Sequence, residues 1–139
     1  CGWGPIALSL AIDSPHATVW AVDVNERALD LVRRNAEELG LSNVNVAQPG
    51  DVPDDVRFRT IRSNPPIRVG KDALHGILLQ WLPRLAPRGQ AYLVVQKNLG
   101  ADSLLPWIRT ALEERHPGQF TASRHATEKG FRILLVERA

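Results

Sequence analysis

The strongest constraint on the fold is an alternation of strand-like and helix-like segments along the chain. Residues 17–23, ATVWAVD, are apolar almost throughout and rich in β-branched and aromatic residues, which is typical of a strand covered on both faces. Residues 26–40 then carry apolar side chains at helical spacing, with Asn25 as a candidate N-cap and Gly40 at the end. Strands that alternate with helices predict a doubly wound α/β fold with a mostly parallel sheet.

The rest of the chain continues this alternation and ends in a predicted hairpin. We expect antiparallel strands at residues 119–126 and 131–138, joined by a turn at residues 127–130. Pro106 is expected to interrupt a helix early in its course. The other predicted elements are helices at residues 5–12, 72–85 and 103–115 and strands at residues 44–47, 56–63 and 91–97, with a turn at residues 86–90.

Composition narrows the class of protein. The 139 residues are 44% hydrophobic and 23% charged, which predicts one domain, residues 1–139, with a sizeable core. The sequence shows neither a bilayer-spanning apolar run nor a secretory leader, so we expect a cytoplasmic protein without a membrane partner. Because the chain opens at Cys1 and contains no methionine, we expect it to be an N-terminally incomplete remainder of a longer protein.

The cysteine and histidine positions and the net charge argue against a disulfide-bonded protein, a metal-binding protein and a general nucleic-acid binder. The single cysteine excludes an internal disulfide, and the four histidines show no metal-ligand spacing, so no metal is expected. The net charge of +2 is too small for a general nucleic-acid footprint, although it is compatible with a local basic patch.

A glycine loop opens the chain and precedes the first predicted helix. It consists of Cys1, Gly2, Trp3 and Gly4, and it would follow a first strand. In an open α/β sheet, ligands bind outside the carboxyl ends of the strands, and Asp23 ends the next strand where an acidic side chain can hold ribose hydroxyls. A proline follows the second glycine, so the third glycine of a dinucleotide fingerprint is absent and a nucleoside without phosphates fits better. A plain turn role for Asp23 stays open.

The segment SNPPIRVGK, residues 63–71, directly follows the strand predicted at residues 56–63. Proline lacks the amide donor and restricts the residue before it to extended backbone. The chain that follows the strand is therefore expected to be rigid at Asn64. Asn-Pro is also an ordinary turn marker, so the tripeptide alone leaves both a turn and a functional loop open.

Taken together, these motifs resemble class I S-adenosylmethionine-dependent methyltransferases. They are most similar to the small-domain (MTS) group that methylates guanine N2 of small-subunit ribosomal RNA, the RsmC-like type. The resemblance covers nearly the whole chain and rests on CGWGPIALSLA, VDVNERALDLVRRNAEELG, SNPPIRVGK, VVQKNLGADS and EKGFRILLVER. It implies a Rossmann-like, seven-stranded sheet with a truncated first strand and an antiparallel last strand. It also implies S-adenosyl-L-methionine as the cofactor and ribosomal RNA or the small ribosomal subunit as the partner.

The resemblance assigns roles to individual residues. Asn64, Pro65 and Pro66 would be catalytic, because the Asn64 amide oxygen and the Pro65 carbonyl would accept hydrogen bonds from an exocyclic amine and favour a pyramidal nitrogen. Asp51 would lie near the adenine amine of the cofactor. The full cofactor set would be Cys1, Gly2, Trp3, Gly4, Asp23, Val24, Asp51 and Asn64. The substrate set would be Ile67, Arg68, Lys71 and Lys97.

The target of methylation is the least constrained feature. Many enzymes with an Asn-Pro-Pro motif have an aromatic residue next, which can stack on the target base, whereas Ile67 stands here. Stacking must then be weaker or come from elsewhere. DNA-adenine and protein-glutamine methyltransferases share the motif and stay alternatives, as does a non-catalytic RNA-binding module with a cofactor fold.

Overall fold

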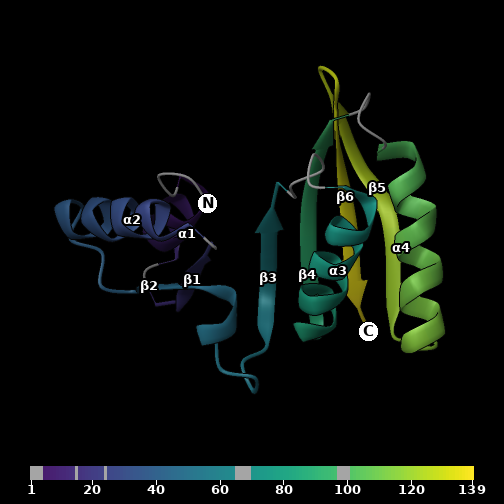
Figure 1. Ribbon diagram of the computed structural model, residues 1–139, viewed down its shortest axis with the longest axis horizontal. Coiled ribbons are helices and arrows are strands. Elements are labelled where there is room, and N and C mark those ends of the chain that lie inside the picture. Colours follow the sequence, from purple (N-terminus) through teal and green to yellow (C-terminus); the bar gives the residue numbers. More distant parts are fainter. Residues whose placement is uncertain (1–4, 15, 24, 65–69, 97–100) are drawn as a thin grey trace. The chain divides into compact units, whose positions relative to one another are not determined.

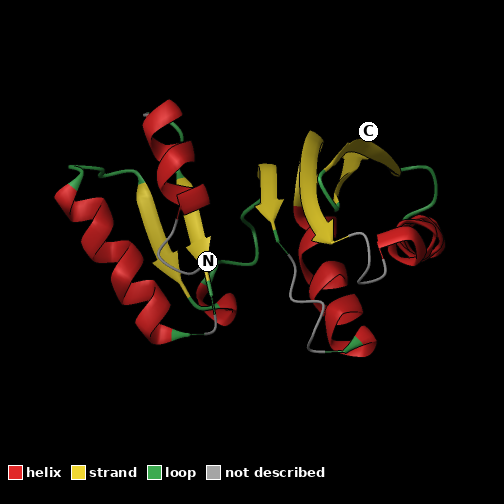
Figure 2. Ribbon diagram, turned by 90° about the horizontal axis from the view of Figure 1, so that it is seen from above, coloured by secondary structure: helices red, strands yellow, loops and turns green. Residues whose placement is uncertain are grey.

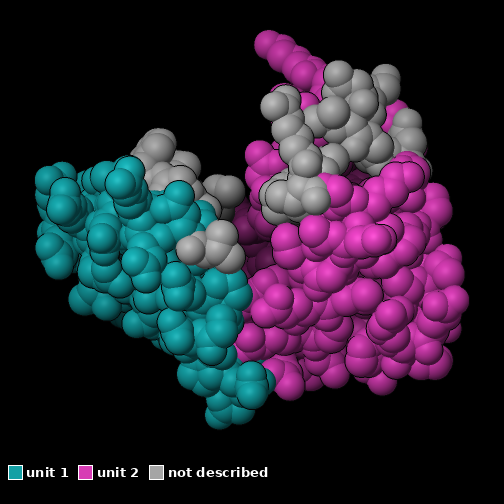
Figure 3. Space-filling model, viewed as in Figure 1, with its two compact units in different colours: residues 1–56 teal, residues 57–139 magenta. Residues whose placement is uncertain are grey.

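The computed structural model describes residues 5–14, 16–23, 25–64, 70–96 and 101–139 (Figure 1). Helices and strands follow one another along the chain (Figure 2). The chain divides into two compact units, residues 1–56 and residues 57–139 (Figure 3). Within the described residues, no helix combines the length and the apolar character needed to cross a membrane.

The first unit is a two-stranded parallel sheet with two long helices. Its helices are α1 (Pro5–Asp13) and α2 (Glu26–Glu38), and its strands are β1 (Val19–Val22) and β2 (Val44–Ala47). The strands pair in parallel register from Val19 opposite Val44 to Val22 opposite Ala47. The predicted strand and amphipathic helix at residues 17–40 are therefore confirmed in type and place.

Packing in the first unit follows the sequence pattern. Leu29, Val32 and Ala36 are buried on one side of α2, as the 3.6-residue period requires. Val32 packs in one core cluster with Ala11 of α1 and with β1. This core therefore holds α1, β1 and α2 together around the end of β1.

The second unit is a four-stranded mixed sheet in the order β3-β4-β6-β5. β3 (Phe58–Ser63) and β4 (Leu85–Gln96) are parallel, whereas β6 (Phe131–Arg138) is antiparallel to both β4 and β5 (Phe120–Glu128). The predicted closing hairpin and its antiparallel last strand are confirmed. The helices are α3 (Lys71–Trp81) between β3 and β4 and α4 (Ala101–Arg115) between β4 and β5, with short 3-10 turns η1 (Pro49–Asp51) in the first unit and η3 (Leu82–Arg84) here.

The core of the second unit lies between its helices and one face of its sheet. Both α3 and α4 lie on the same face (Figures 1 and 2). Alternate β4 residues, Ala91, Leu93 and Val95, are buried in one cluster with Leu78 of α3 and Ile108 of α4. Because side chains alternate along a strand, the residues between them face away from these helices.

Two sequence expectations differ from the structure. The described residues form the six strands predicted within the chain, in sheets of two and four strands, and the single seven-stranded sheet implied by the resemblance stays a prediction. The turn expected at residues 86–90 lies inside β4, because the strand resumes pairing with β3 beyond an irregularity. Pro106 lies inside an unbroken α4 that starts at Ala101, so the proline removes one hydrogen bond near the helix start without ending the helix.

The irregularity in β4 predicts a sensitive glycine. Phe58 pairs with Leu85 but Thr60 pairs with Gln90, so residues 86–89 bulge between the two pairs. A Cβ atom at Gly89 would lie 2.8 Å from the carbonyl oxygens of both Ala86 and Phe58. We therefore expect Gly89→Ala to lower the free energy of unfolding by about 2 kcal/mol, measured by urea unfolding.

Gly76→Ala is the matched control for this substitution. Gly76 lies in α3, and a Cβ atom there would meet nothing within 4 Å. Alanine favours helix over glycine by up to about 1 kcal/mol, so this variant should be as stable as the wild type or more stable. Equal stability of Gly89→Ala and wild type would show that the bulge is free to relax.

Candidate functional site

Two carboxylates lie at the same edge of the first unit. Asp23 follows β1 directly, and Asp51 ends the 3-10 turn that follows β2. Since β1 and β2 are parallel neighbours that end together at Val22 and Ala47, both carboxylates come from the carboxyl ends of adjacent strands. Asp23 is half-buried and Asp51 is exposed. This edge offers hydrogen-bond acceptors for hydroxyl or amine groups.

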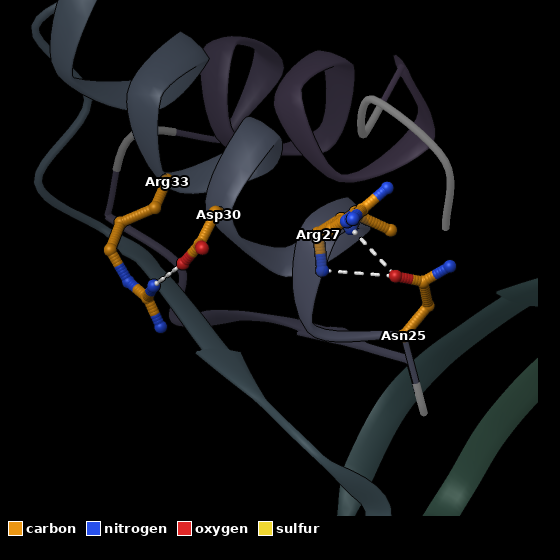
Figure 4. Close-up of polar contacts among 5 residues, drawn as sticks. Asn25, Arg27, Asp30 and Arg33 are labelled. Carbon is orange, nitrogen blue, oxygen red and sulfur yellow. Dashed lines mark hydrogen bonds and ion pairs between the residues drawn. The ribbon is translucent and has the colours of Figure 1, made fainter.

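The start of α2 orients the Asp23 carboxylate. The backbone N–H of Asn25 donates to Asp23 Oδ1 at 2.9 Å. The Asn25 side chain in turn accepts from the backbone N–H groups of Arg27 at 2.9 Å and Ala28 at 3.3 Å (Figure 4). The N-cap thus holds the carboxylate near the positive end of the helix dipole, which favours an anion.

A second polar contact in the same view belongs to the solvent face of α2. Arg33 Nη1 lies 2.7 Å from Asp30 Oδ1 (Figure 4), and both side chains are more than half exposed. Exposed pairs of this kind contribute little to stability. We assign it no role in the site.

An amide and a cation lie at one end of the second unit. Asn64 follows β3 directly and is exposed, and Lys71 is the first residue of α3 and is also exposed. Ser63 pairs with Leu93, so parallel β4 extends past the end of β3 at this same edge. An exposed amide here can accept and donate hydrogen bonds, which suits the positioning of a substrate rather than proton abstraction.

Gly70, the N-cap of α3, has a backbone conformation that favours glycine. Its backbone has φ 102° and ψ 158°, a region that other residues rarely adopt. Sequence patterns did not single out this requirement, nor the contact between Asn25 and Asp23. The glycine immediately before a helix and the Asp-x-Asn spacing were the available signals.

The structure describes only part of the predicted site. It places Asp23 and Asp51 at the edge of the first unit and Asn64 and Lys71 at an edge of the second. The other predicted residues lie outside the described residues: Cys1, Gly2, Trp3, Gly4, Val24, Pro65, Pro66, Ile67, Arg68 and Lys97. Among the residues that are described, no three His, Cys, Asp or Glu side chains gather as metal ligands would.

Sequence comparison places the chain among known proteins. A family profile described as the methyltransferase small domain matches residues 1–134. The uncharacterized YbxB protein of Bacillus subtilis is 39% identical over 117 residues, which are 82% of this chain and 58% of YbxB. A release factor glutamine methyltransferase of Salmonella typhimurium is 35% identical over 139 residues, 99% of this chain and 48% of that protein. The chain therefore spans about half the length of these curated relatives.

Structural comparison agrees with the predicted fold class. The 16S rRNA N2 methyltransferase RsmC of T. thermophilus, solved with AdoMet and guanosine, superposes with a TM-score of 0.66 at 20% identity. The match covers 94% of this chain and 31% of that one. The likeness establishes a Rossmann-like α/β fold for the chain.

Proposed function

Because the chain belongs to the methyltransferase small domain family, we propose that it carries out methyl transfer from S-adenosylmethionine to an exocyclic amine. The observation that carries this proposal is Asn64, which lies exposed directly after β3 and is followed by two prolines. An asparagine at the carboxyl end of a parallel strand lies where ligands of open α/β sheets bind.

The cofactor would bind at the carboxylate edge of the first unit. The Asp23 carboxylate, oriented by the N–H of Asn25, is suited to accept hydrogen bonds from two ribose hydroxyls. Asp51 would accept from the adenine amine, and Val24 and the glycine loop at residues 1–4 would line the same site. We propose that both units belong to one catalytic domain with a seven-stranded sheet.

The proposed chemistry is direct in-line transfer. Bound S-adenosylmethionine supplies an electrophilic methyl group on a sulfonium. The Asn64 amide oxygen and the Pro65 carbonyl would accept hydrogen bonds from the target amine and favour a pyramidal nitrogen with a free lone pair. Attack of this nitrogen on the methyl group would release S-adenosylhomocysteine, with the amine proton passing to solvent. The two prolines would restrict the backbone that carries these acceptors.

For the substrate, we propose guanine N2 of small-subunit ribosomal RNA. Lys71 is exposed at the start of α3, Arg68 lies between Asn64 and Lys71 in the sequence, and Lys97 directly follows β4. Positively charged side chains near a substrate site suit the binding of RNA phosphates. The second candidate is a protein glutamine, favoured by the 35% identity with the Salmonella release factor enzyme across 99% of the chain.

Methyl transfer from tritiated S-adenosylmethionine distinguishes the two substrates. The acceptors are undermethylated 16S ribosomal RNA, in free form and in small subunits, and an unmethylated release factor. We expect label in RNA that digests to N2-methylguanosine. Label in glutamine would instead establish the protein substrate. Cofactor binding without transfer to either acceptor would contradict both.

A further inference from the structure

One face of the sheet in the second unit carries apolar and aromatic side chains. The helices of this unit do not cover that face. Both α3 and α4 lie on the opposite face (Figures 1 and 2). Ala91, Leu93 and Val95 of β4 are buried with those helices, so Tyr92 and Val94 project from the other face. Among the described residues of this unit, no helix packs against Tyr92 or Val94.

A hollow of about 490 Å³ lies on this face. Its described lining is Val94, Ile133, Phe131 and Lys129. Val94 pairs with Ile133 and Gln96 with Phe131, so two aliphatic side chains form the floor and an aromatic ring stands one step further along the strands. Phe131 is 38% exposed, a large exposed fraction for a phenylalanine.

Lys129 is the one charged side chain among the described residues that line the hollow, and further basic side chains lie around Tyr92. Lys129, exposed in the turn between β5 and β6, stands at the rim. The Arg62 guanidinium lies 5.8 Å from the centre of the Tyr92 ring, and the His125 ring meets Tyr92 edge-on at 5.4 Å.

The sheet register places Val94, one end of this hollow, on the strand next to Asn64. Ser63 pairs with Leu93, so the next residues, Asn64 and Val94, follow on adjacent parallel strands. From standard strand spacings, Phe131 lies two strands across and two residues along, roughly 12 Å from Asn64. A nucleotide one or two positions from a base at Asn64 can span this distance.

We propose that the hollow binds a nucleotide flanking the methylated base of a single-stranded RNA segment. The flanking base lies against Phe131 and the floor formed by Val94 and Ile133, and its phosphate lies by Lys129. An aromatic ring with an adjacent cation matches a base with its phosphate, whereas an apolar peptide side chain would need no cation. This site also supplies aromatic surface that Ile67 does not. The proposal rests on the proposed function, with RNA as its substrate.

The test measures binding of a fluorescein-labelled, nine-nucleotide RNA with a central guanosine by fluorescence anisotropy, in the presence of S-adenosylhomocysteine. We expect Phe131→Ala to raise the Kd about 5- to 30-fold, because one stacked base is lost. Lys129→Gln should lower the slope of log Kd against log salt by about one, because one phosphate contact is lost. Neither substitution should change the Kd for S-adenosylhomocysteine.

The matched controls lie on the solvent face of α2. Leu31 is 44% exposed, so Leu31→Ala removes a similarly exposed apolar side chain. Arg34 is exposed, so Arg34→Gln removes a similar cation. Both should bind the RNA as the wild type does. As a second measurement, photo-crosslinking of RNA with 4-thiouridine beside the guanosine should label the peptide that contains Phe131.

Three outcomes would overturn the proposal. If the wild type methylates RNA but both site variants bind the nonamer unchanged, the hollow is not a nucleotide site and the proposed function stands. If the wild type methylates a release factor glutamine and binds no RNA, the nucleotide site and the proposed RNA substrate are both wrong. If Phe131→Ala lowers the Tm by several degrees with unchanged RNA affinity and no crosslink, another protein segment covers the hollow.

Discussion

Replacing Asn64 with alanine is expected to lower kcat by roughly 10²–10³ while the affinity for S-adenosylmethionine barely changes. The side-chain oxygen would accept its hydrogen bond mainly as the amine nitrogen becomes pyramidal, so its loss removes transition-state stabilisation alone. Loss of one preorganised hydrogen-bonding group has an effect of this size. Single-turnover methylation of undermethylated ribosomal RNA measures the rate, and calorimetry measures cofactor binding.

Asn64→Asp separates hydrogen-bond acceptance from mere shape. Aspartate keeps an acceptor of the same size and adds a charge, so this variant should retain more activity than Asn64→Ala if acceptance is the whole role. Asn45→Ala, at another exposed asparagine, is the control and should react at the wild-type rate. Equal rates for wild type and both Asn64 variants would show that Asn64 is only a turn residue.

Asp23→Ala is expected to weaken S-adenosylmethionine binding by about 1.5–3 kcal/mol, the range for hydrogen bonds to a charged group. The carboxylate is held at the end of β1 by the backbone N–H of Asn25 at 2.9 Å, so it is oriented before the cofactor arrives. Isothermal titration calorimetry measures the change.

Asn25→Ala tests whether any loss comes from the local fold instead. It removes the side-chain cap of α2 and should lower the free energy of unfolding by about 1 kcal/mol. The backbone N–H that holds Asp23 remains, so cofactor affinity should stay close to wild type. If the Asp23→Ala protein binds the cofactor as tightly as the wild type, Asp23 is not part of the cofactor site.

Local sequence patterns predicted the individual helices and strands and pointed to the polar residues that follow them. The strand before Asp23, the amphipathic α2 and the closing hairpin were predicted because periods of 2 and 3.6 residues and capping residues are local signals. Asp23 and Asn64 were recognisable for the same reason, since each directly follows a run with strand character. Their proposed roles came from the resemblance of the surrounding motifs to a family.

The pairing of the strands could not be predicted from local patterns. The bulge at residues 86–89 depends on the register of β4 against β3, and the expected turn was absorbed into β4 because pairing with β3 resumes at Gln90. The hollow at Val94 exists because β6 inserts between β4 and β5, bringing Ile133 opposite Val94. Strand order and register arise from contacts between distant residues, which no local period encodes.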